Sequence, residues 1–166
     1  ISPWNFPVIL SLAALVTALG AGNRVMMKLS EFTPKTNKVI VNICRELSEY
    51  VEVFEGEADV AQAFSQLPFD HLLFTGSTNV GRAVAKAAAE NLTPVTLELG
   101  GKSPVIIAED ADMKKTVDAI LFGKCINAGQ ICVAPDYAFV PQERAEEFIT
   151  LFLKRFEKLY LKSNKN

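Results

Sequence analysis

The 166-residue sequence is poor in the residues that bind metals, with one histidine and three cysteines. A single histidine leaves too few ligands for a His/Cys metal cluster. Cys44, Cys125 and Cys132 are odd in number and follow neither a zinc-site nor a disulfide-scaffold spacing. We therefore expect no metal. Free thiols are typical of a reducing compartment, which predicts a cytoplasmic protein.

The sequence also has no excess of charge of one sign. It contains 17 Lys and Arg against 19 Asp and Glu, for a net charge of −2. This balance gives no electrostatic reason to expect nucleic acid or an anionic membrane as a partner. With 49% hydrophobic and 22% charged residues, the composition is that of a globular domain with a core of its own.

The uncharged run at residues 6–22 is short for a membrane span. As a helix it would extend about 25 Å, against the ~30 Å hydrocarbon core of a bilayer. It also lacks the basic region that opens a signal peptide. We expect a buried helix of an α/β protein here, and no membrane segment in this chain.

Strand-like and helix-like patterns alternate along the chain. Strands are expected at 24–29, 50–54, 71–75, 95–99, 105–108 and 136–140, and helices at 8–19, 33–47, 58–65, 79–90, 112–124 and 142–160. The buried face of the second helix is expected to hold Val39, Ile40, Ile43 and Leu47. This alternation predicts an α/β fold with a doubly wound, mostly parallel sheet.

The Gly100-Gly101 pair separates two runs of alternating strands and helices. We expect it to divide residues 1–99 from residues 100–166 as two domains. The polar tail at 162–166 is expected to be loose, because chain ends without apolar residues have nothing to hold them.

A glycine-containing turn joins the third predicted strand to the helix after it, in the segment from Phe74 to Arg82, FTGSTNVGR. A helix N-terminus offers N–H groups and partial positive charge to a phosphate. The segment is not a G-x-G-x-x-G fingerprint, and Arg82 stands where a P-loop needs lysine. Alone, the segment fits a phosphate-binding turn or an ordinary capped turn equally well.

Lys28 and Glu31 follow the first predicted strand. Ligands of a parallel sheet bind beyond the carboxyl ends of its strands, where these side chains could contact ribose hydroxyls. The alternative is a solvated loop with a surface ion pair.

Glu98 and Cys132 are the residues with catalytic potential. Glu98 interrupts the apolar stretch at 95–99, where a buried carboxylate would gain the raised pKa of a general base; alternatively, it faces solvent on an edge strand. Cys132 lies in a predicted loop, where a thiolate can act as a nucleophile. Buried apolar filling is the alternative, and is expected for Cys44 and Cys125. The single histidine, His71, is expected to be structural.

In chain order, five segments resemble motifs of the aldehyde dehydrogenase superfamily. The segment from Pro3 to Pro7 is similar to P-W-N-[FY]-P, and residues 28–31 are similar to K-P-S-E, with Leu29 in place of proline. Residues 74–81 are similar to F-T-G-S-T-x-V-G, residues 97–104 to E-L-G-G-K-S-P, and residues 129–132 to G-Q-x-C. Residues 127–137, NAGQICVAPDY, are similar to the class 3 and coniferyl aldehyde dehydrogenase branch.

The resemblance implies a Rossmann-like cofactor domain, the start of an α/β catalytic domain, and NAD(P)-dependent oxidation of an aldehyde to a carboxylic acid. Cys132 would attack the aldehyde carbon. The side-chain amide of Asn5 and the backbone N–H of Cys132 would stabilise the oxyanion. Glu98 would activate the water that hydrolyses the thioester. Branches that transfer the acyl group to coenzyme A typically lack this glutamate.

Cofactor contacts are implied for six residues: Lys28 and Glu31 at the adenosine ribose, Ser77 and Trp4 along the pyrophosphate, and Gly76 and Gly81 in the turn. The carboxylate of Glu31 favours NAD, because it would repel a 2′-phosphate, while Lys28 leaves NADP use open. The resemblance also implies a hydrophobic or aromatic aldehyde, such as coniferyl aldehyde, and a homodimeric parent.

Members of the family are longer than this chain, which begins with Ile1 rather than Met. We therefore expect a fragment that lacks the family's E-[IV]-F-G-P motif and its oligomerisation hairpin. Three alternatives follow: a piece of an active enzyme, a non-catalytic nucleotide-binding fragment, and a redox-sensing protein in which Cys132 is only a reactive thiol.

Overall fold

The structure is a computed structural model that describes residues 1–161. The polar tail expected at 162–166 lies outside the described residues. The chain divides into two compact units, Ile1–Gly100 (unit 1) and Gly101–Asn166 (unit 2). The division falls within the Gly100-Gly101 pair.

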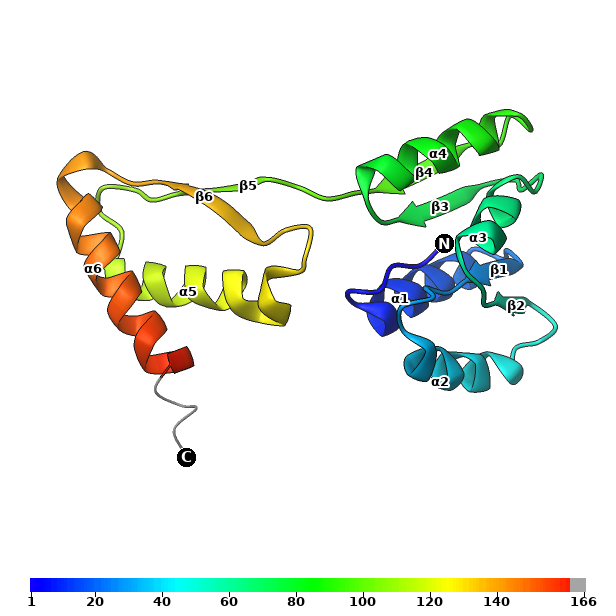
Figure 1. Ribbon diagram of the computed structural model, residues 1–166, viewed down its shortest axis with the longest axis horizontal. Helices are drawn as coiled ribbons and strands as arrows, with labels where there is room; N and C mark the ends of the chain where they lie inside the picture. Colours follow the sequence, from blue (N-terminus) through cyan, green and yellow to red (C-terminus); the bar gives the residue numbers. More distant parts are fainter. Residues whose placement is uncertain (162–166) are drawn as a thin grey trace. The chain divides into compact units, whose positions relative to one another are not determined.

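Unit 1 alternates helices and strands in the predicted order (Figure 1). Its elements are α1 (Pro7–Gly20), β1 (Val25–Lys28), α2 (Pro34–Arg45), β2 (Val51–Phe54), α3 (Ala58–Ser65), β3 (Leu72–Thr75), α4 (Thr78–Ala89) and β4 (Val95–Glu98). Pro7 and Pro34 stand in the first turn of their helices, where a missing N–H removes no helical hydrogen bond. The α/β fold class is confirmed, and every strand pair is parallel.

The first two residues connect the strand pairs β1–β2 and β3–β4. The Ile1 nitrogen donates to the Leu73 carbonyl (2.7 Å), and the Thr75 N–H donates to the Ile1 carbonyl (3.1 Å). On the other side, the Ser2 N–H donates to the Lys28 carbonyl (2.9 Å). The spatial order is therefore β2, β1, residues 1–2, β3, β4 (Figure 1). Because the chain builds outward first on one side and then on the other, the sheet is doubly wound, with its switch point beside residues 1–2.

Two apolar clusters lie within unit 1. One joins α1, β1, α2 and β2, and contains Leu15, Met27, Leu29, Ile40, Cys44 and Val51. The other joins α3, β3 and α4, and contains Phe64, Leu72, Phe74, Val84 and Ala88. Together they fix the strands whose ends carry the candidate site.

Two expectations about helix burial are wrong. In α2 the buried residues are Asn37, Ile40 and Cys44, whereas Val39 is 57% exposed and Ile43 is 49% exposed. In α1, which was expected to be a buried helix, only Ser11 and Leu15 are buried. The helix therefore has one exposed apolar face in this chain. The buried face of α2 includes a polar residue, Asn37, whose burial cannot be predicted from hydrophobic periodicity.

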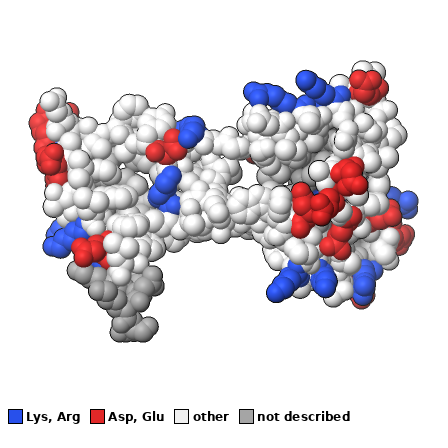
Figure 2. Space-filling view, viewed as in Figure 1, with Lys and Arg blue, Asp and Glu red and all other residues white. Residues whose placement is uncertain are grey.

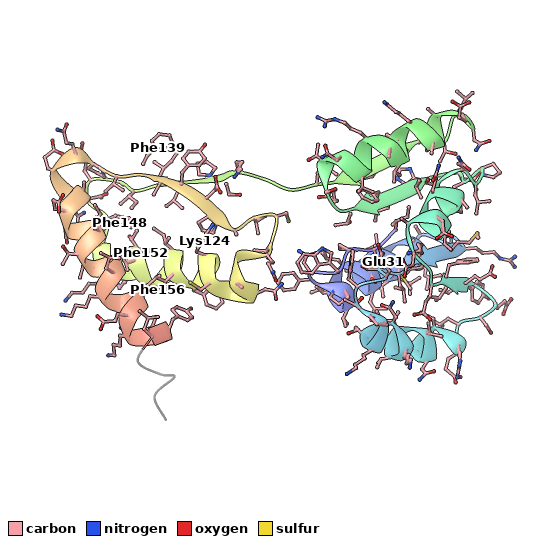
Figure 3. The ribbon with its side chains drawn as sticks, viewed as in Figure 1. Glu31, Lys124, Phe139, Phe148, Phe152 and Phe156 are labelled. Atoms are coloured by element: carbon pink, nitrogen blue, oxygen red, sulfur yellow. The ribbon has the colours of Figure 1, made fainter. Side chains whose placement is uncertain are left out.

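Unit 2 contains β5 (Ser103–Ile106), α5 (Met113–Cys125), η1 (Ile126–Gly129), β6 (Pro135–Phe139), η2 (Gln142–Arg144), α6 (Ala145–Phe156) and η3 (Glu157–Leu161). β5 and β6 pair in parallel, with an irregularity that leaves Asp136 without a partner in the register. Buried residues of α5 pack against phenylalanines that line one side of α6 (Figure 3). The cluster holds Ile107, Met113, Val117 and Leu121, with Phe148, Phe152 and Phe156.

Two expectations for unit 2 are also wrong in detail. The strand expected at 105–108 begins two residues earlier, at Ser103. The single helix expected at 142–160 is divided into a short 3₁₀ turn, α6 and a terminal π turn.

Within residues 1–161, no helix is both long and apolar enough to cross a membrane. Figure 2 shows side chains of both signs on the face in view, in keeping with the balanced composition, with several Asp and Glu side chains close together on unit 1. In the same described range, no three His, Cys, Asp or Glu side chains are grouped so as to hold a metal ion.

Candidate active site

Most of the predicted site residues gather at one edge of unit 1. Lys28 is the last residue of β1, Thr75 of β3 and Glu98 of β4, and the register aligns Thr75 with Glu98. The loop that carries Trp4 and Asn5 follows residues 1–2, at the switch point of the sheet. Because parallel strands end at the same edge, these side chains share the place where doubly wound sheets bind their ligands.

The turn after β3 is a well-formed helix start. Ser77 is the N-cap of α4, and its Oγ accepts a hydrogen bond from the Val80 N–H at 3.3 Å. An accepting hydroxyl keeps its own hydrogen for donation to a ligand. Ser77 therefore caps the helix, and capping does not exclude the phosphate contact, since the helix N-terminus still favours an anion.

Gly76 and Gly81 allow this turn to close over the core. A Cβ on Gly76 would lie 2.5 Å from Cζ of the Phe74 ring, and a Cβ on Gly81 would lie 2.8 Å from Cδ2 of Leu99. Phe74 is only 4% exposed, so its ring has little freedom to move away. A side chain at Gly76 would therefore lift the turn from the sheet.

Lys28 and Glu31 form a pair at the end of β1 (Figure 3 marks Glu31). Lys28 Nζ donates to the Leu29 carbonyl at 2.8 Å and lies 3.8 Å from Glu31 Oε2. The Lys28 side chain is 1% exposed and that of Glu31 is 32% exposed. The alternative of a solvated loop therefore does not hold for Lys28, although the ion pair with Glu31 is present. A buried ammonium needs such partners to offset its lost hydration.

Glu98 faces solvent in this chain. Burial along β4 alternates, with Val95 and Leu97 half-buried and Thr96 and Glu98 exposed. Of the two alternatives for this carboxylate, the described chain therefore shows the exposed strand end. Asn5 is half-buried and Trp4 is 45% exposed.

Cys132 is exposed in unit 2, on the loop between η1 and β6. Three consecutive residues before it adopt positive φ: Asn127 (48°), Ala128 (56°) and Gly129 (77°). The left-handed region is unfavourable for alanine, so the Ala128 backbone is strained. Strained backbone often accompanies functional sites because the surrounding structure must hold it in place.

The other two thiols are less accessible. Cys44 is 3% exposed, and burial raises the pKa of its thiol. Cys125 is half-buried. Because the thiolate is the nucleophile, exposure favours Cys132 among the three. The expected burial of Cys44 is confirmed.

Gly101 supports the Cys132 loop from within unit 2. A Cβ on Gly101 would come within 2.7 Å of the Cys132 carbonyl oxygen. The next residue, Lys102, places Nζ 3.2 Å from Oδ1 of Asp136, close to the start of β6. The sequence predicted only a boundary turn at Gly101. The close approach of the Gly101 and Cys132 backbones, which leaves no room for a side chain at Gly101, is seen only in the structure.

A cavity of about 340 Å³ in unit 1 does not coincide with the predicted site. Its lining includes Val25, His71 and Leu72, near the amino ends of β1 and β3, and none of the predicted site residues. His71 is exposed, and its Nε2 lies 3.0 Å from the Thr96 hydroxyl. The geometry of the strand ends, rather than this cavity, defines the candidate site.

Known proteins that resemble this chain include aldehyde dehydrogenases. The model of the aldehyde dehydrogenase family matches residues 1–166. A probable coniferyl aldehyde dehydrogenase of Pseudomonas aeruginosa is 56% identical over 92% of this chain, which covers 32% of that protein.

Two solved structures share the fold. The substrate-bound AldH of Staphylococcus aureus has a TM-score of 0.89 and 45% identity, over 96% of this chain and 35% of the other. A variant of aldehyde dehydrogenase C from Pseudomonas syringae, bound to NAD+ and octanal, has a TM-score of 0.87 and 32% identity, over 92% and 33%. The chain thus spans about a third of the length of the proteins it matches.

Proposed function

The chain belongs to the aldehyde dehydrogenase family, and we propose that the protein containing it oxidises an aldehyde to a carboxylic acid with NAD(P)+. The single observation that carries this proposal is the exposed Cys132 thiol on a strained loop, in a segment, residues 129–132, that resembles the family's G-Q-x-C motif. The predicted cofactor residues at one edge of unit 1 support it.

The residues at the strand ends fit a dinucleotide. The α4 N-terminus with its Gly76-Ser77 turn suits a phosphate, and the glycine at 76 lets the turn lie against the buried Phe74 ring. Lys28 and Glu31 would hold the adenosine ribose, and Trp4 and Ser77 would lie along the pyrophosphate. When bound, NAD(P)+ supplies the hydride acceptor that turns the cysteine adduct into a thioester.

The first step assigned to this chain is nucleophilic. The Cys132 thiolate forms a C–S bond to the aldehyde carbon, and the π electrons of the carbonyl move to its oxygen. The Asn5 amide and the Cys132 backbone N–H would donate to that oxyanion, each contributing on the order of 3 kcal/mol to transition-state stabilisation. The strained loop would hold the sulfur in place for this attack.

The second step is hydrolytic. Glu98 would take a proton from water as the oxygen attacks the thioester carbon; the C–S bond then breaks and Cys132 leaves as a thiolate. Its position at an exposed strand end gives the carboxylate access to water. With a base at this position, the expected product is a free carboxylic acid rather than an acyl-coenzyme A.

The proposal extends to finer assignments. Glu31 favours NAD over NADP through repulsion of a 2′-phosphate, and dual use is compatible with Lys28. Resemblance to a probable coniferyl aldehyde dehydrogenase favours a hydrophobic or aromatic aldehyde. In this proposal unit 1 is part of the cofactor domain and unit 2 begins the catalytic domain. The parent is a cytoplasmic homodimer, and the three free thiols fit a reducing compartment.

A second candidate is nucleotide binding without turnover by this chain alone. It is favoured by the placement of all the cofactor residues within unit 1 and by the chain's one-third share of its relatives. Cofactor titration of this polypeptide, beside an aldehyde turnover assay, separates the two, because binding without NADH formation supports the second.

The proposed function is tested by NADH formation from a panel of hydrophobic aldehydes with the whole protein. Wild type and Cys125→Ala should produce NADH, and Cys132→Ala should not. NADH formation by Cys132→Ala at the wild-type rate would refute the assigned nucleophile. A third reading, redox sensing by Cys132, predicts no aldehyde turnover in any of the three.

A further inference from the structure

We propose that Asn37 is a positioning residue: it fixes the loop that carries Glu31, and so sets the affinity for the adenosine ribose and the preference between NAD and NADP. The inference rests on the proposed function, because it takes Glu31 as the carboxylate that binds the ribose. Asn37 lies in the first turns of α2 and belongs to none of the predicted motifs.

Asn37 is a buried amide whose two polar ends both bond to the loop before α2. It is 2% exposed. Its Nδ2 donates to the Ser30 carbonyl at 2.8 Å, and its Oδ1 accepts from the Thr33 hydroxyl at 3.0 Å. A buried amide is costly unless it is bonded in this way, so its bonds define the position of the loop.

The bonds converge on both sides of Glu31. The Ser30 carbonyl also accepts from the Thr33 N–H at 3.3 Å, and the Ser30 hydroxyl accepts from the Phe32 N–H at 3.4 Å. Phe32 and Thr33 are thus both hydrogen-bonded to Ser30, on either side of Glu31 in the loop. On the preceding side, Lys28 Nζ donates to the Leu29 carbonyl.

The hydrogen bonds among Ser30, Thr33 and Asn37 form a network that takes the place of the usual N-cap hydrogen bond of α2. Thr33 is the N-cap of α2, yet its side chain makes no cap hydrogen bond. Threonine at an N-cap usually accepts from an N–H of the first turn. Here its hydroxyl lies against Asn37 and the Ser30 carbonyl instead, so the side chain holds the loop.

Packing alone does not call for an amide at this position. Asn37, Ile40 and Cys44 form the buried stripe of α2, and the other two are apolar. The polar member is the one nearest the Glu31 loop. Because a carboxylate fixed in place can bind both ribose hydroxyls and repel a 2′-phosphate, loosening the loop should weaken NAD binding and reduce discrimination against NADP.

The test uses the whole protein with Asn37→Ala and Thr33→Val, each of which removes part of the network. We expect the Kd for NAD, from calorimetric titration, to rise about tenfold, as for loss of one well-placed hydrogen bond. The ratio of the NADP and NAD dissociation constants should move toward one. The aldehyde KM, and kcat at saturating NAD, should stay at their wild-type values, a split that general damage to the fold would not produce.

Ile40→Val is the matched control. It lies on the same buried stripe, is 1% exposed and does not contact the loop through a polar group, so it should lower the unfolding temperature while leaving NAD affinity unchanged. If Thr33→Val and any folded Asn37→Ala protein bind NAD and NADP as wild type does, or if Ile40→Val weakens NAD binding equally, the inference is wrong.

The outcome also separates this inference from the function on which it rests. If wild type binds neither dinucleotide, or if Glu31→Gln changes neither dissociation constant, the ribose assignment fails and takes the inference with it. If Glu31→Gln alters the NAD and NADP affinities but the network variants do not, the ribose assignment stands and only the role of Asn37 is refuted.

Discussion

The Cys132 carbonyl lies so close to Gly101 that a Cβ on Gly101 would approach its oxygen to 2.7 Å. The neighbouring atom is backbone, so no side-chain rotation can relieve the contact. The loop that carries the proposed nucleophile therefore packs against a glycine far earlier in the chain, at a place that has no room for a side chain.

The first prediction concerns this contact. Gly101→Ala should displace the Cys132 loop and lower kcat/KM for aldehyde by about 100-fold, the order expected for a reacting group moved by about 1 Å. NAD affinity should not change, since the predicted cofactor residues lie in unit 1. Gly100→Ala is the matched control, because a Cβ there meets nothing within 4 Å and its activity should be that of wild type. Full activity in Gly101→Ala would show that the loop does not depend on this contact.

The second prediction concerns the Gly76-Ser77 turn, which we propose to bind a phosphate. Gly76→Ala places a Cβ 2.5 Å from the tip of the buried Phe74 ring and should lift the turn, weakening NAD binding by about tenfold. Alkylation of Cys132 should proceed at the wild-type rate. As a control, Gly20→Ala adds a methyl group in open space at the end of α1 and should leave NAD binding unchanged. Equal affinities for all three proteins would remove the turn from the cofactor site.

The third prediction concerns thiol reactivity. Burial raises the pKa of Cys44, so at neutral pH less of it is thiolate, and at 3% exposure it is also shielded from reagent. With limiting iodoacetamide, peptide mapping of the whole native protein should find label on Cys132 and none on Cys44. After denaturation both should react. Preferential labelling of Cys44 in the native protein would contradict the described burial.

The fourth prediction concerns pH and the start of α5. Hydrogen bonds from the Lys115 and Lys114 N–H groups, with the nearby Lys115 ammonium, hold the pKa of the Asp112 carboxyl below its ordinary range. A carboxylate with a lowered folded-state pKa stabilises the fold above its unfolded-state pKa, and this contribution is lost as pH falls through the folded-state value.

Asp112→Ala should therefore unfold at a lower temperature than wild type at neutral pH. The difference should persist down to about pH 4 and shrink below it. Asp112→Asn retains a good N-cap residue and should lie between the two at neutral pH. Thermal unfolding at several pH values measures this; a difference that grows on acidification would contradict the assigned cap.

The order of strands and helices could be predicted from the sequence because each segment carries its own periodicity and turn residues. The limits of α3 were predicted to the residue, and a capped turn, one of the two alternatives for residues 74–82, is present with Ser77 as the cap. The predicted limits were wrong where a contact between residues far apart in the sequence sets the start of a strand. The strand at Ser103 begins earlier than expected because Ser103 and Pro104 pair with β6, although proline is a poor strand residue.

Burial was harder to predict than secondary structure. The α2 face was misplaced because Asn37 is buried by hydrogen bonds to a loop carbonyl, which no hydrophobic pattern reports. A solvated loop was one of the two alternatives for Lys28, and the side chain is instead buried, with the Leu29 carbonyl and the Glu31 carboxylate beside its ammonium group. The residues of the candidate site were proposed from motifs and stay a prediction, whereas the contacts of Gly101 and Asn37 could be found only in the structure.

The central claim, that Cys132 is acylated and Glu98 releases the product, is tested most directly in the whole protein carrying Glu98→Gln. This protein would be mixed with NAD and a hydrophobic aldehyde, quenched and examined by peptide mass spectrometry. The account predicts one equivalent of NADH per site and an acyl group on the peptide that contains Cys132, with little further turnover. Continued turnover at the wild-type rate, or an acyl group on a residue other than Cys132, would contradict it.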